Sequence, residues 1–143
     1  MDPQPFRMTV EAGKVREFAL AVRSSDPDHL GQVPVSPPTF LQSSSWWQRP
    51  ENSPWHGVSR DYSRLLHGSQ EMEFFGEPPS AGTELEGVSR IDQVYEKAGK
   101  RGGNMTFTEV VTEFRDVATG RVVATSRNTS IETSKVVDSE EAK

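Results

Sequence analysis

The chain of 143 residues contains no cysteine, which removes three classes of site at once. Without a thiol it can form no disulfide framework, carry no thiolate nucleophile and hold no cysteine-ligated metal. Its three histidines are His29, His56 and His67, and their spacing matches no metal-binding motif such as H-x-x-x-H. We therefore expect neither a metal ion nor another cofactor.

Long apolar runs and clustered positive charge are missing as well. No segment approaches the roughly 18 apolar residues of a membrane span, and the segment M-D-P-Q-P-F-R-M has no apolar signal region. The net charge of −5 argues against nucleic acid as a partner, since phosphate binding needs clustered Lys and Arg. These absences predict a cytoplasmic protein without a membrane span or a nucleic-acid partner.

Hydrophobic residues are also few, at 33% of the chain. A chain of this length forms one domain with a core of its own, but the low apolar content keeps that core modest. We therefore expect a partner subunit to complete it.

Two segments predict helices. Residues 11–22 form the first, because apolar side chains recur there at helical spacing. These side chains are Val15, Phe18, Ala19 and Val22. Thr9 is the expected N-cap of this helix, and Pro27 is expected to end it. The second helix is short and runs from about Thr39 to Trp47.

Four later segments predict strands, at residues 69–75, 84–97, 104–117 and 121–133. The turns A-G-K-R-G-G-N and A-T-G-R separate the last three and are typical of hairpins. Gly87 predicts a bulge or bend. One face of such an antiparallel sheet must be covered, and the short helix is the expected cover. A sheet wrapped around a central helix is the hot-dog architecture.

Several motifs in this order resemble the N-terminal-type domain of MaoC-like dehydratases. They are V-R-E-F-A, S-D-P-D-H, P-P-T-F, L-H-G-S-Q-E-M-E-F, P-P-S-A-G-T and D-Q-V-Y-E-K. This hot-dog family includes (R)-specific enoyl-CoA hydratases and mycobacterial hydroxyacyl-ACP dehydratase subunits. The resemblance implies an α+β fold, a single hot-dog domain with an antiparallel sheet wrapped around a central α-helix. The domain is expected at residues 9–134, after an N-terminal extension at 1–8 and before a flexible tail at 135–143.

Active members of the family carry the signature D-x-N-P-x-H. On this chain its histidine falls on His29, its proline on Pro27, its asparagine on Asp26 and its catalytic aspartate on Ser24. Hydration of a double bond needs one group to deprotonate water and another to deliver a proton. A neutral histidine suits this chemistry near pH 7, but an unassisted serine hydroxyl is not a base.

The resemblance therefore predicts the substrate-binding, non-catalytic half of a two-chain hydratase or dehydratase. A first alternative is a self-sufficient (R)-specific enoyl-CoA hydratase that uses His29 with Asp26 or Asp28. A second is a non-enzymatic module that binds a lipid or polyketide. A thioesterase is disfavoured, because hot-dog thioesterases commonly carry an acid near the central helix and residues 39–48 contain none. Whether the chain is an enzyme by itself stays open.

The resemblance also implies a substrate site at the central helix. Backbone N–H groups near Thr39 and Phe40 are expected to polarise a thioester carbonyl. Trp46, Trp47 and Trp55 either wall an acyl tunnel or fill the core and a dimer seam, where aromatic residues are enriched.

The expected partners are an acyl-CoA or acyl-ACP thioester and a second hot-dog chain. We expect a homodimer when the chain is alone and a heterodimer when a catalytic MaoC-like subunit is present. Edge-to-edge pairing of the sheets is expected to bury at least roughly 1,200 Å², with some of the three tryptophans at or near the seam.

Overall fold

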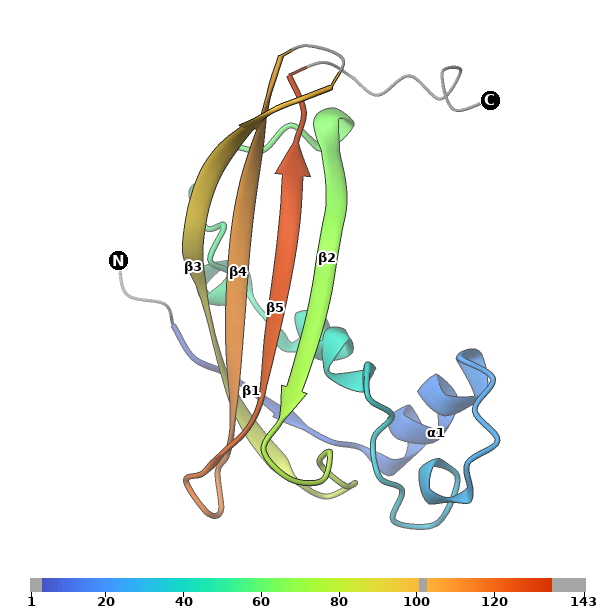
Figure 1. The fold of residues 1–143 in the computed structure, drawn as a ribbon. Helices are drawn as coiled ribbons and strands as arrows, with labels where there is room; N and C mark the ends of the chain where they lie inside the picture. Colours follow the sequence, from blue (N-terminus) through green and yellow to red (C-terminus); the bar gives the residue numbers. More distant parts are fainter. Residues whose placement is uncertain (1–3, 101–102, 135–143) are drawn as a thin grey trace.

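The fold is a twisted antiparallel sheet with short helical segments on one side (Figure 1). The computed structural model describes residues 4–100 and 103–134. Its strands lie in the order β1-β3-β4-β5-β2. They are β1 Phe6–Thr9, β2 Leu65–Phe74, β3 Glu84–Ala98, β4 Asn104–Asp116 and β5 Val122–Glu132. No helix in the described part of the chain is long and apolar enough to cross a membrane.

The four strands predicted from the sequence are all present. The segment predicted at 69–75 begins earlier than expected, at Leu65, because its first residues pair with the end of β5. The predicted turn A-T-G-R closes the hairpin between β4 and β5, where Asp116 N–H donates to Arg121 O over 2.9 Å. The predicted tail at 135–143 lies outside the described residues.

Strand β1 was not predicted and corrects the expected N-terminal extension. Residues Phe6–Thr9 pair with Glu84–Gly87 of β3, so the chain joins the sheet from Phe6 onward. Phe6 and Met8 point into the core, with exposed fractions of 3% and 2%. Thr9 is not a helix N-cap: it ends β1, and its hydroxyl donates to the Glu84 carboxylate over 3.1 Å.

The first helix is confirmed as α1, Ala12–Ala21. Val15 and Ala19 are fully buried, whereas Val22 lies beyond the helix and is half exposed. The helix ends before Pro27, because Arg23 adopts a left-handed backbone with φ of 57°. The N–H of Ser24 then donates back to Ala19 O over 2.8 Å, which satisfies a carbonyl at the helix end.

The second helix forms where expected but as a 3₁₀ helix, η2, Phe40–Trp47. Its first turn closes from Phe40 N–H to Pro37 O over 2.9 Å. The Ser43 hydroxyl donates to Phe40 O over 2.7 Å. Serine side chains that bond the local backbone compete with regular α-helix formation. The predicted central α-helix is therefore corrected to a 3₁₀ helix of eight residues.

The hydrophobic core lies at one end of the sheet. There β1, the start of β3 and the end of β4 meet α1 and η2. The Phe6 and Phe114 rings pack edge to face with centroids 6.3 Å apart, and Phe18 and Phe40 do the same at 5.6 Å. Toward the other end, η2 stops while the strands continue (Figure 1).

Gly87 does not mark a bulge, contrary to the sequence prediction. The register of β3 shifts between Ile91 and Gln93 instead. Gly87 lies against the ring of Phe6, and a Cβ there would overlap the ring atoms. Glycine is therefore required at this position by the close packing of β1 on β3.

We predict that Gly87→Ala destabilises the fold by about 1–3 kcal/mol through overpacking. Urea unfolding followed by circular dichroism measures the effect. Gly13→Ala in α1 is the matched control: a Cβ added at Gly13 would meet no atom within 4 Å, so this change should stabilise the helix by about 0.4–1 kcal/mol. Equal effects of the two substitutions would contradict the packing role of Gly87.

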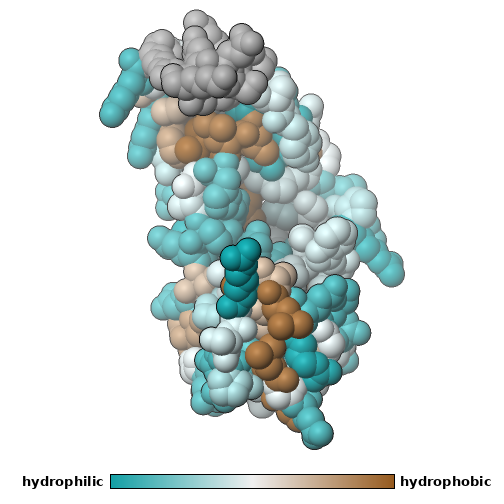
Figure 2. Space-filling model, turned by 90° about the vertical axis from the view of Figure 1, so that its right-hand side faces the viewer, coloured by the Kyte–Doolittle hydropathy of each residue, from teal (hydrophilic) through white to brown (hydrophobic). Residues whose placement is uncertain are grey.

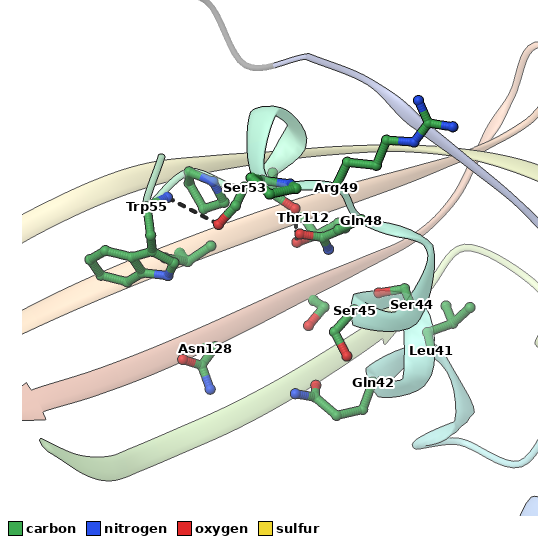
Figure 3. Close-up of a pocket in the computed structure, with 15 residues that line it drawn as sticks. Leu41, Gln42, Ser44, Ser45, Gln48, Arg49, Ser53, Trp55, Thr112 and Asn128 are labelled. Atoms are coloured by element: carbon green, nitrogen blue, oxygen red, sulfur yellow. Dashed lines mark hydrogen bonds between the residues drawn. The ribbon is translucent and has the colours of Figure 1, made fainter. Parts of the chain in front are cut away.

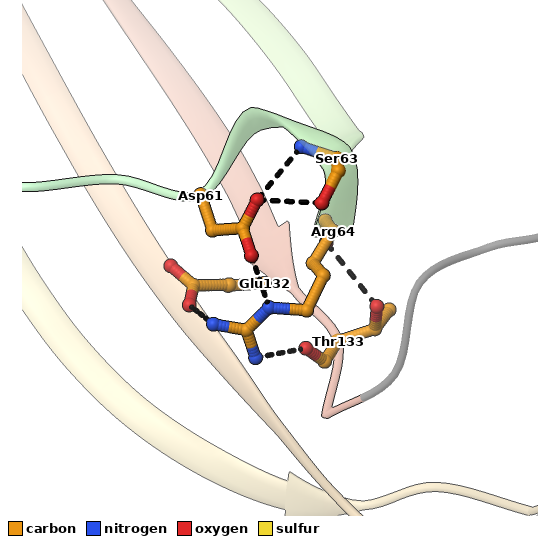
Figure 4. Close-up of polar contacts among 5 residues, drawn as sticks. All are labelled: Asp61, Ser63, Arg64, Glu132 and Thr133. Carbon is orange, nitrogen blue, oxygen red and sulfur yellow. Dashed lines mark hydrogen bonds and ion pairs between the residues drawn. The ribbon is translucent and has the colours of Figure 1, made fainter.

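A polar cluster secures the opposite end of the sheet (Figure 4). The Arg64 guanidinium, at the end of η4, Tyr62–Arg64, bonds Asp61 Oδ2 at 2.8 Å and Glu132 Oε1 at 2.7 Å. It also donates to Thr133 O over 2.9 Å. Hydrogen bonds from Ser63, followed by that from Arg64, lower the pKa of the Asp61 carboxyl below its usual value. The cluster joins the segment before β2 to the end of β5.

We predict that this cluster contributes to stability above the unfolded-state pKa of aspartate and that its contribution falls as the pH drops through the lower folded pKa of Asp61. Asp61→Asn should therefore weaken the fold at neutral pH and flatten its loss of stability between about pH 5 and about pH 2. Urea midpoints across that range provide the test. Glu77→Gln is the control, since Glu77 makes no hydrogen bond or ion pair within the described ranges. An unchanged slope for Asp61→Asn would contradict the role of the cluster.

Candidate functional site

A cavity of about 450 Å³ lies between η2 and the inner face of the sheet (Figure 3). The helix side is formed by η2 and the loop after it, which includes the 3₁₀ turn η3, Pro50–Asn52. The sheet side is formed by inward-facing residues of β3, β4 and β5. The cavity exists because the core side chains stop at Leu41 and Phe114, while the sheet continues beyond them.

The sheet wall of the cavity is polar and hydrogen-bonded within itself. Ser89 Oγ on β3 and Thr112 Oγ1 on β4 share a hydrogen bond of 2.8 Å. Gln70 Nε2 on β2 donates to Ser126 Oγ over 2.7 Å, and Asn128 Nδ2 donates to Gln70 Oε1 over 3.1 Å. Because side chains alternate across a strand, Ser126 and Asn128 both face the cavity from β5.

The opposite wall also carries polar side chains, and three of them have no hydrogen bond in the described part of the chain. Gln42, Ser45 and Gln48 line the cavity from η2 and its C-terminal end. Within residues 4–100 and 103–134 none of these three side chains makes a hydrogen bond. Figure 3 shows Gln42 and Ser45 directed toward the strand that carries Asn128. These groups can bond a ligand without breaking a contact inside the protein.

An aromatic residue of the cavity lining carries a cation on its ring. The Trp55 ring lines the cavity, and the Arg60 guanidinium stacks on it 3.6 Å from the ring centroid. Arg60 also donates to Ser130 Oγ on β5 over 2.9 Å. Burial lowers the pKa of the Arg60 guanidinium from its usual value, although the group stays cationic at neutral pH.

The other aromatic residues singled out in the sequence lie elsewhere, in a groove between α1 and η2. This groove has a volume of about 440 Å³ and brings together Phe40, Trp46 and Trp47 with Phe18 of α1. Trp46 is 86% exposed, so it forms an outer rim. Thr39 lines neither this groove nor the cavity on the sheet.

The predicted backbone donor at Phe40 is already used. Its N–H donates to Pro37 O over 2.9 Å, inside the first turn of η2. An N–H engaged in this way does not polarise a thioester carbonyl unless the turn opens. A carbonyl-binding site around Thr39 and Phe40 stays a prediction that depends on this opening.

The structure brings His29 and Asp26 together in the turn that follows α1. This turn is the 3₁₀ segment η1, Pro27–His29, capped by Asp26 Oδ1, which accepts from Asp28 N–H over 3.0 Å. The second oxygen, Asp26 Oδ2, lies 3.8 Å from His29 Nε2. The Ser24 hydroxyl accepts from Asp26 N–H over 3.3 Å and contacts the backbone rather than the histidine.

His29 is held by the segment that follows the turn. Its Nδ1 lies 2.7 Å from Val35 O, and a carbonyl only accepts, so Nδ1 carries the proton. Nε2 of the neutral ring is then an acceptor facing a second acceptor on Asp26. A direct hydrogen bond between the two side chains requires the protonated imidazole. Neither His29 nor Asp26 lines the two cavities described above.

The polar sheet wall was missed by sequence reasoning, although the sequence contains a signal for it. Ser89, Ser126 and Asn128 occupy alternating strand positions that continue from buried residues such as Leu85 and Ala124. Polar residues at positions where the pattern calls for apolar ones are informative, because a buried polar group needs a partner. Only the pairing register shows that they meet around one cavity.

Comparison with known proteins places this geometry in a family. Residues 1–126 match the family model described as FAS1-like, dehydratase domain region. A UPF0336 protein of Saccharopolyspora erythraea is 31% identical over 129 residues, which are 82% of this chain and 77% of that protein. A UPF0336 protein of Streptomyces griseus is 35% identical over 95 residues. That match spans 60% of this chain and 63% of the relative's length.

Solved structures share the fold at low sequence identity. The ChsH1-ChsH2 complex from Mycobacterium tuberculosis matches with a TM-score of 0.75 and 14% identity, over 95% of this chain and 86% of that chain. A MaoC-like dehydratase from Phytophthora capsici matches with a TM-score of 0.72 and 20% identity, over 96% of this chain and 48% of that chain. The HadBC (3R-hydroxyacyl-ACP dehydratase) complex from Mycobacterium tuberculosis matches with a TM-score of 0.68 and 19% identity, over 91% of this chain and 96% of that chain. These likenesses confirm the single hot-dog α+β domain.

Proposed function

Since the chain belongs to the family of FAS1-like dehydratase regions and has the hot-dog fold of MaoC-like dehydratases, we propose that it is the substrate-binding, non-catalytic half of a two-chain enzyme. The enzyme hydrates or dehydrates acyl-CoA or acyl-ACP thioesters. The observation that carries this proposal is the turn after α1. It holds a serine at the position of the family's catalytic aspartate and uses its histidine to fasten the backbone.

The turn lacks the pair of groups that the reaction needs. Ser24 is neutral and its hydroxyl bonds the backbone of Asp26. Asp26 has one oxygen in the cap of η1 and a side chain that is 53% exposed. A general base works best when a second group fixes its orientation toward the water. Here the second group is Asp26, which lies two positions further along the turn than the family's aspartate and is exposed to solvent.

What the chain contributes, on this proposal, is a place for the acyl group. The cavity between η2 and the sheet has about 450 Å³, within the usual range of roughly 300–1,000 Å³ for small-molecule sites. Its two walls come from separate layers of the fold, so an acyl group would lie between them. The groove beside α1 is a less favourable position, because Trp46 on its rim is almost fully exposed.

The partner chain would join at the open edge of β3. Strand β1 pairs only with Glu84–Gly87, and beyond Gly87 the described part of β3 has no neighbour on that side. An open edge of this length favours pairing with another strand. Val94 on this segment is 60% exposed. Two of the matched structures are complexes of two proteins, HadBC and ChsH1-ChsH2, which supports the same arrangement here.

Exposed apolar surface elsewhere also supports an assembly. Figure 2 shows hydrophobic surface in two separate places on one face, with polar side chains between them. Leu20 on α1 is 65% exposed. The three tryptophans remain candidates for the seam: Trp46 is exposed, whereas Trp47 and Trp55 are partly covered.

A second candidate function is a self-sufficient hydratase. One observation favours it: Asp26 Oδ2 lies 3.8 Å from His29 Nε2, and one water between the two groups could be bonded by both. On this alternative His29 takes the proton from water while Asp26 orients it.

We predict that the purified chain alone hydrates crotonyl-CoA and longer enoyl-CoAs no faster than a denatured control. With a partner hydratase that carries an intact D-x-N-P-x-H signature, turnover should appear. His29→Ala in this chain should then change the rate of the complex by less than about tenfold, because the acid and base lie in the partner.

Asp26→Asn is the paired variant and should behave like His29→Ala. The self-sufficient hydratase predicts the reverse: activity of the isolated chain, lost by about 10²- to 10⁴-fold in His29→Ala. That result would exclude the non-catalytic role.

We predict that the isolated chain forms a homodimer, with twice the monomer mass of 15.9 kDa in light scattering at micromolar concentration. Val94→Asp should shift it toward the monomer, because a charge at the edge of β3 opposes strand pairing. Val33→Asp is the matched control, an exposed valine outside the sheet. A monomeric wild-type chain, or equal effects of the two substitutions, would refute pairing at this edge.

A further inference from the structure

We propose that the cavity between η2 and the sheet selects acyl groups that carry neutral oxygen substituents, hydroxyl or keto groups, over saturated alkyl chains of the same length. The proposal rests on the function proposed above and names its substrate class. It follows from the chemistry of the two cavity walls.

The lining combines apolar surface with a dense set of hydrogen-bonding side chains. Ten of the 15 residues around the cavity carry a polar side chain. A saturated chain placed there would displace water from these groups without replacing its hydrogen bonds, and such desolvation opposes binding. A chain with its own oxygens can make the replacement bonds.

The sheet wall offers hydrogen-bonding groups in a row. Ser126 and Asn128 lie two residues apart on β5, a spacing of about 7 Å along a strand. The bonded pair of Ser89 and Thr112 continues the polar surface across β4 to β3. Hydroxyl and amide groups of this kind can both donate and accept, so they suit hydroxyl and keto oxygens alike.

The helix wall supplies polar side chains that are available to bond a ligand. The side chains of Gln42, Ser45 and Gln48 face the cavity and make no hydrogen bond in the described part of the chain. An acyl oxygen between the layers would meet a bonded group on the sheet and an unoccupied one on η2. This arrangement favours binding of acyl chains that carry oxygen substituents.

The lining also lacks charge where a ligand would lie, which points to neutral oxygens. Arg49 is the one ionisable residue among the 15. Figure 3 shows its guanidinium directed away from the cavity. Arg60, the nearby cation stacked on Trp55, does not line the cavity, and it is bonded to Ser130 Oγ beyond the stretch between Thr112 and Asn128.

The test is calorimetric titration of the full chain, in its native assembly, with acyl-pantetheines. Pantetheine is the arm that CoA and carrier proteins share, so the probes serve either source. Octanoyl-pantetheine and its 5-hydroxy-7-oxo counterpart form the matched pair, with pantetheine as the blank. We expect the oxygenated probe to bind at least about tenfold more tightly.

Variants on each wall locate the preference. Thr112→Val keeps the side-chain shape and removes a hydroxyl from the sheet wall, and Gln48→Leu removes an amide from the other wall. Each should reduce the preference by about threefold or more, to the advantage of octanoyl-pantetheine. Thr125→Val is the control, because Thr125 lies on the opposite face of β5 from Ala124 and Ser126. The Gln48 side chain makes no hydrogen bond within residues 4–100 and 103–134, so its variant serves even if Thr112→Val disturbs the Ser89 contact.

The outcomes separate the two proposals. Octanoyl-pantetheine binding as tightly as the oxygenated probe overturns the inference and leaves the proposed function standing. Failure of both probes to bind better than pantetheine overturns the proposed function, and the inference with it. A preference that survives both Thr112→Val and Gln48→Leu also overturns the inference, since it would arise outside this cavity.

Discussion

The packing of one short 3₁₀ helix against long strands determines the rest of this structure. Eight residues of η2 rise about 16 Å at the 3₁₀ spacing of roughly 2.0 Å per residue. The 13 residues of β4 extend about 44 Å at roughly 3.4 Å per residue. The helix therefore covers only part of the inner face, and the core of Phe6, Phe40 and Phe114 is confined to that part.

The uncovered part of the sheet explains both the cavity and the expected partner. Where η2 ends, the inner face changes from Phe114 and Ala124 to Thr112, Ser126 and Asn128, and an irregular loop replaces the helix as cover. The cavity lies beneath the polar residues of η2 and this loop. At the edge, β1 is too short to follow β3 beyond Gly87. On the proposed function, the cavity takes the ligand and the open edge of β3 takes the second sheet.

Much of the fold could be predicted from the sequence, because its signals are local. Alternation and hairpin turns mark the strands from β2 to β5, and helical spacing marks α1. Strand β1 was missed because four residues give too short a pattern. The 3₁₀ character of η2 was missed because its apolar residues suit either helix, and the choice depends on local bonds such as Ser43 to Phe40 O.

The candidate site was harder to predict, because it depends on long-range register. The S-D-P-D-H turn was recognised, and the structure places Asp26 beside His29. Its tie to Val35 O was not foreseen, since no local pattern specifies it. Trp46 and Trp47 lie in η2, and of the three tryptophans only Trp55 lines the cavity on the sheet. A contact between any of them and an acyl group stays a prediction. The polar wall is formed by residues of β3, β4 and β5, and the pairing register of these strands cannot be read from the sequence.

The central claim is that the acyl group lies between η2 and the sheet while the reacting groups come from another chain. A crystal structure of the assembly with a non-hydrolysable acyl thioether tests it most directly. We expect density for the acyl group against Thr112 and Asn128, under Gln48. Density in the groove between α1 and η2, or beside His29, would contradict the account.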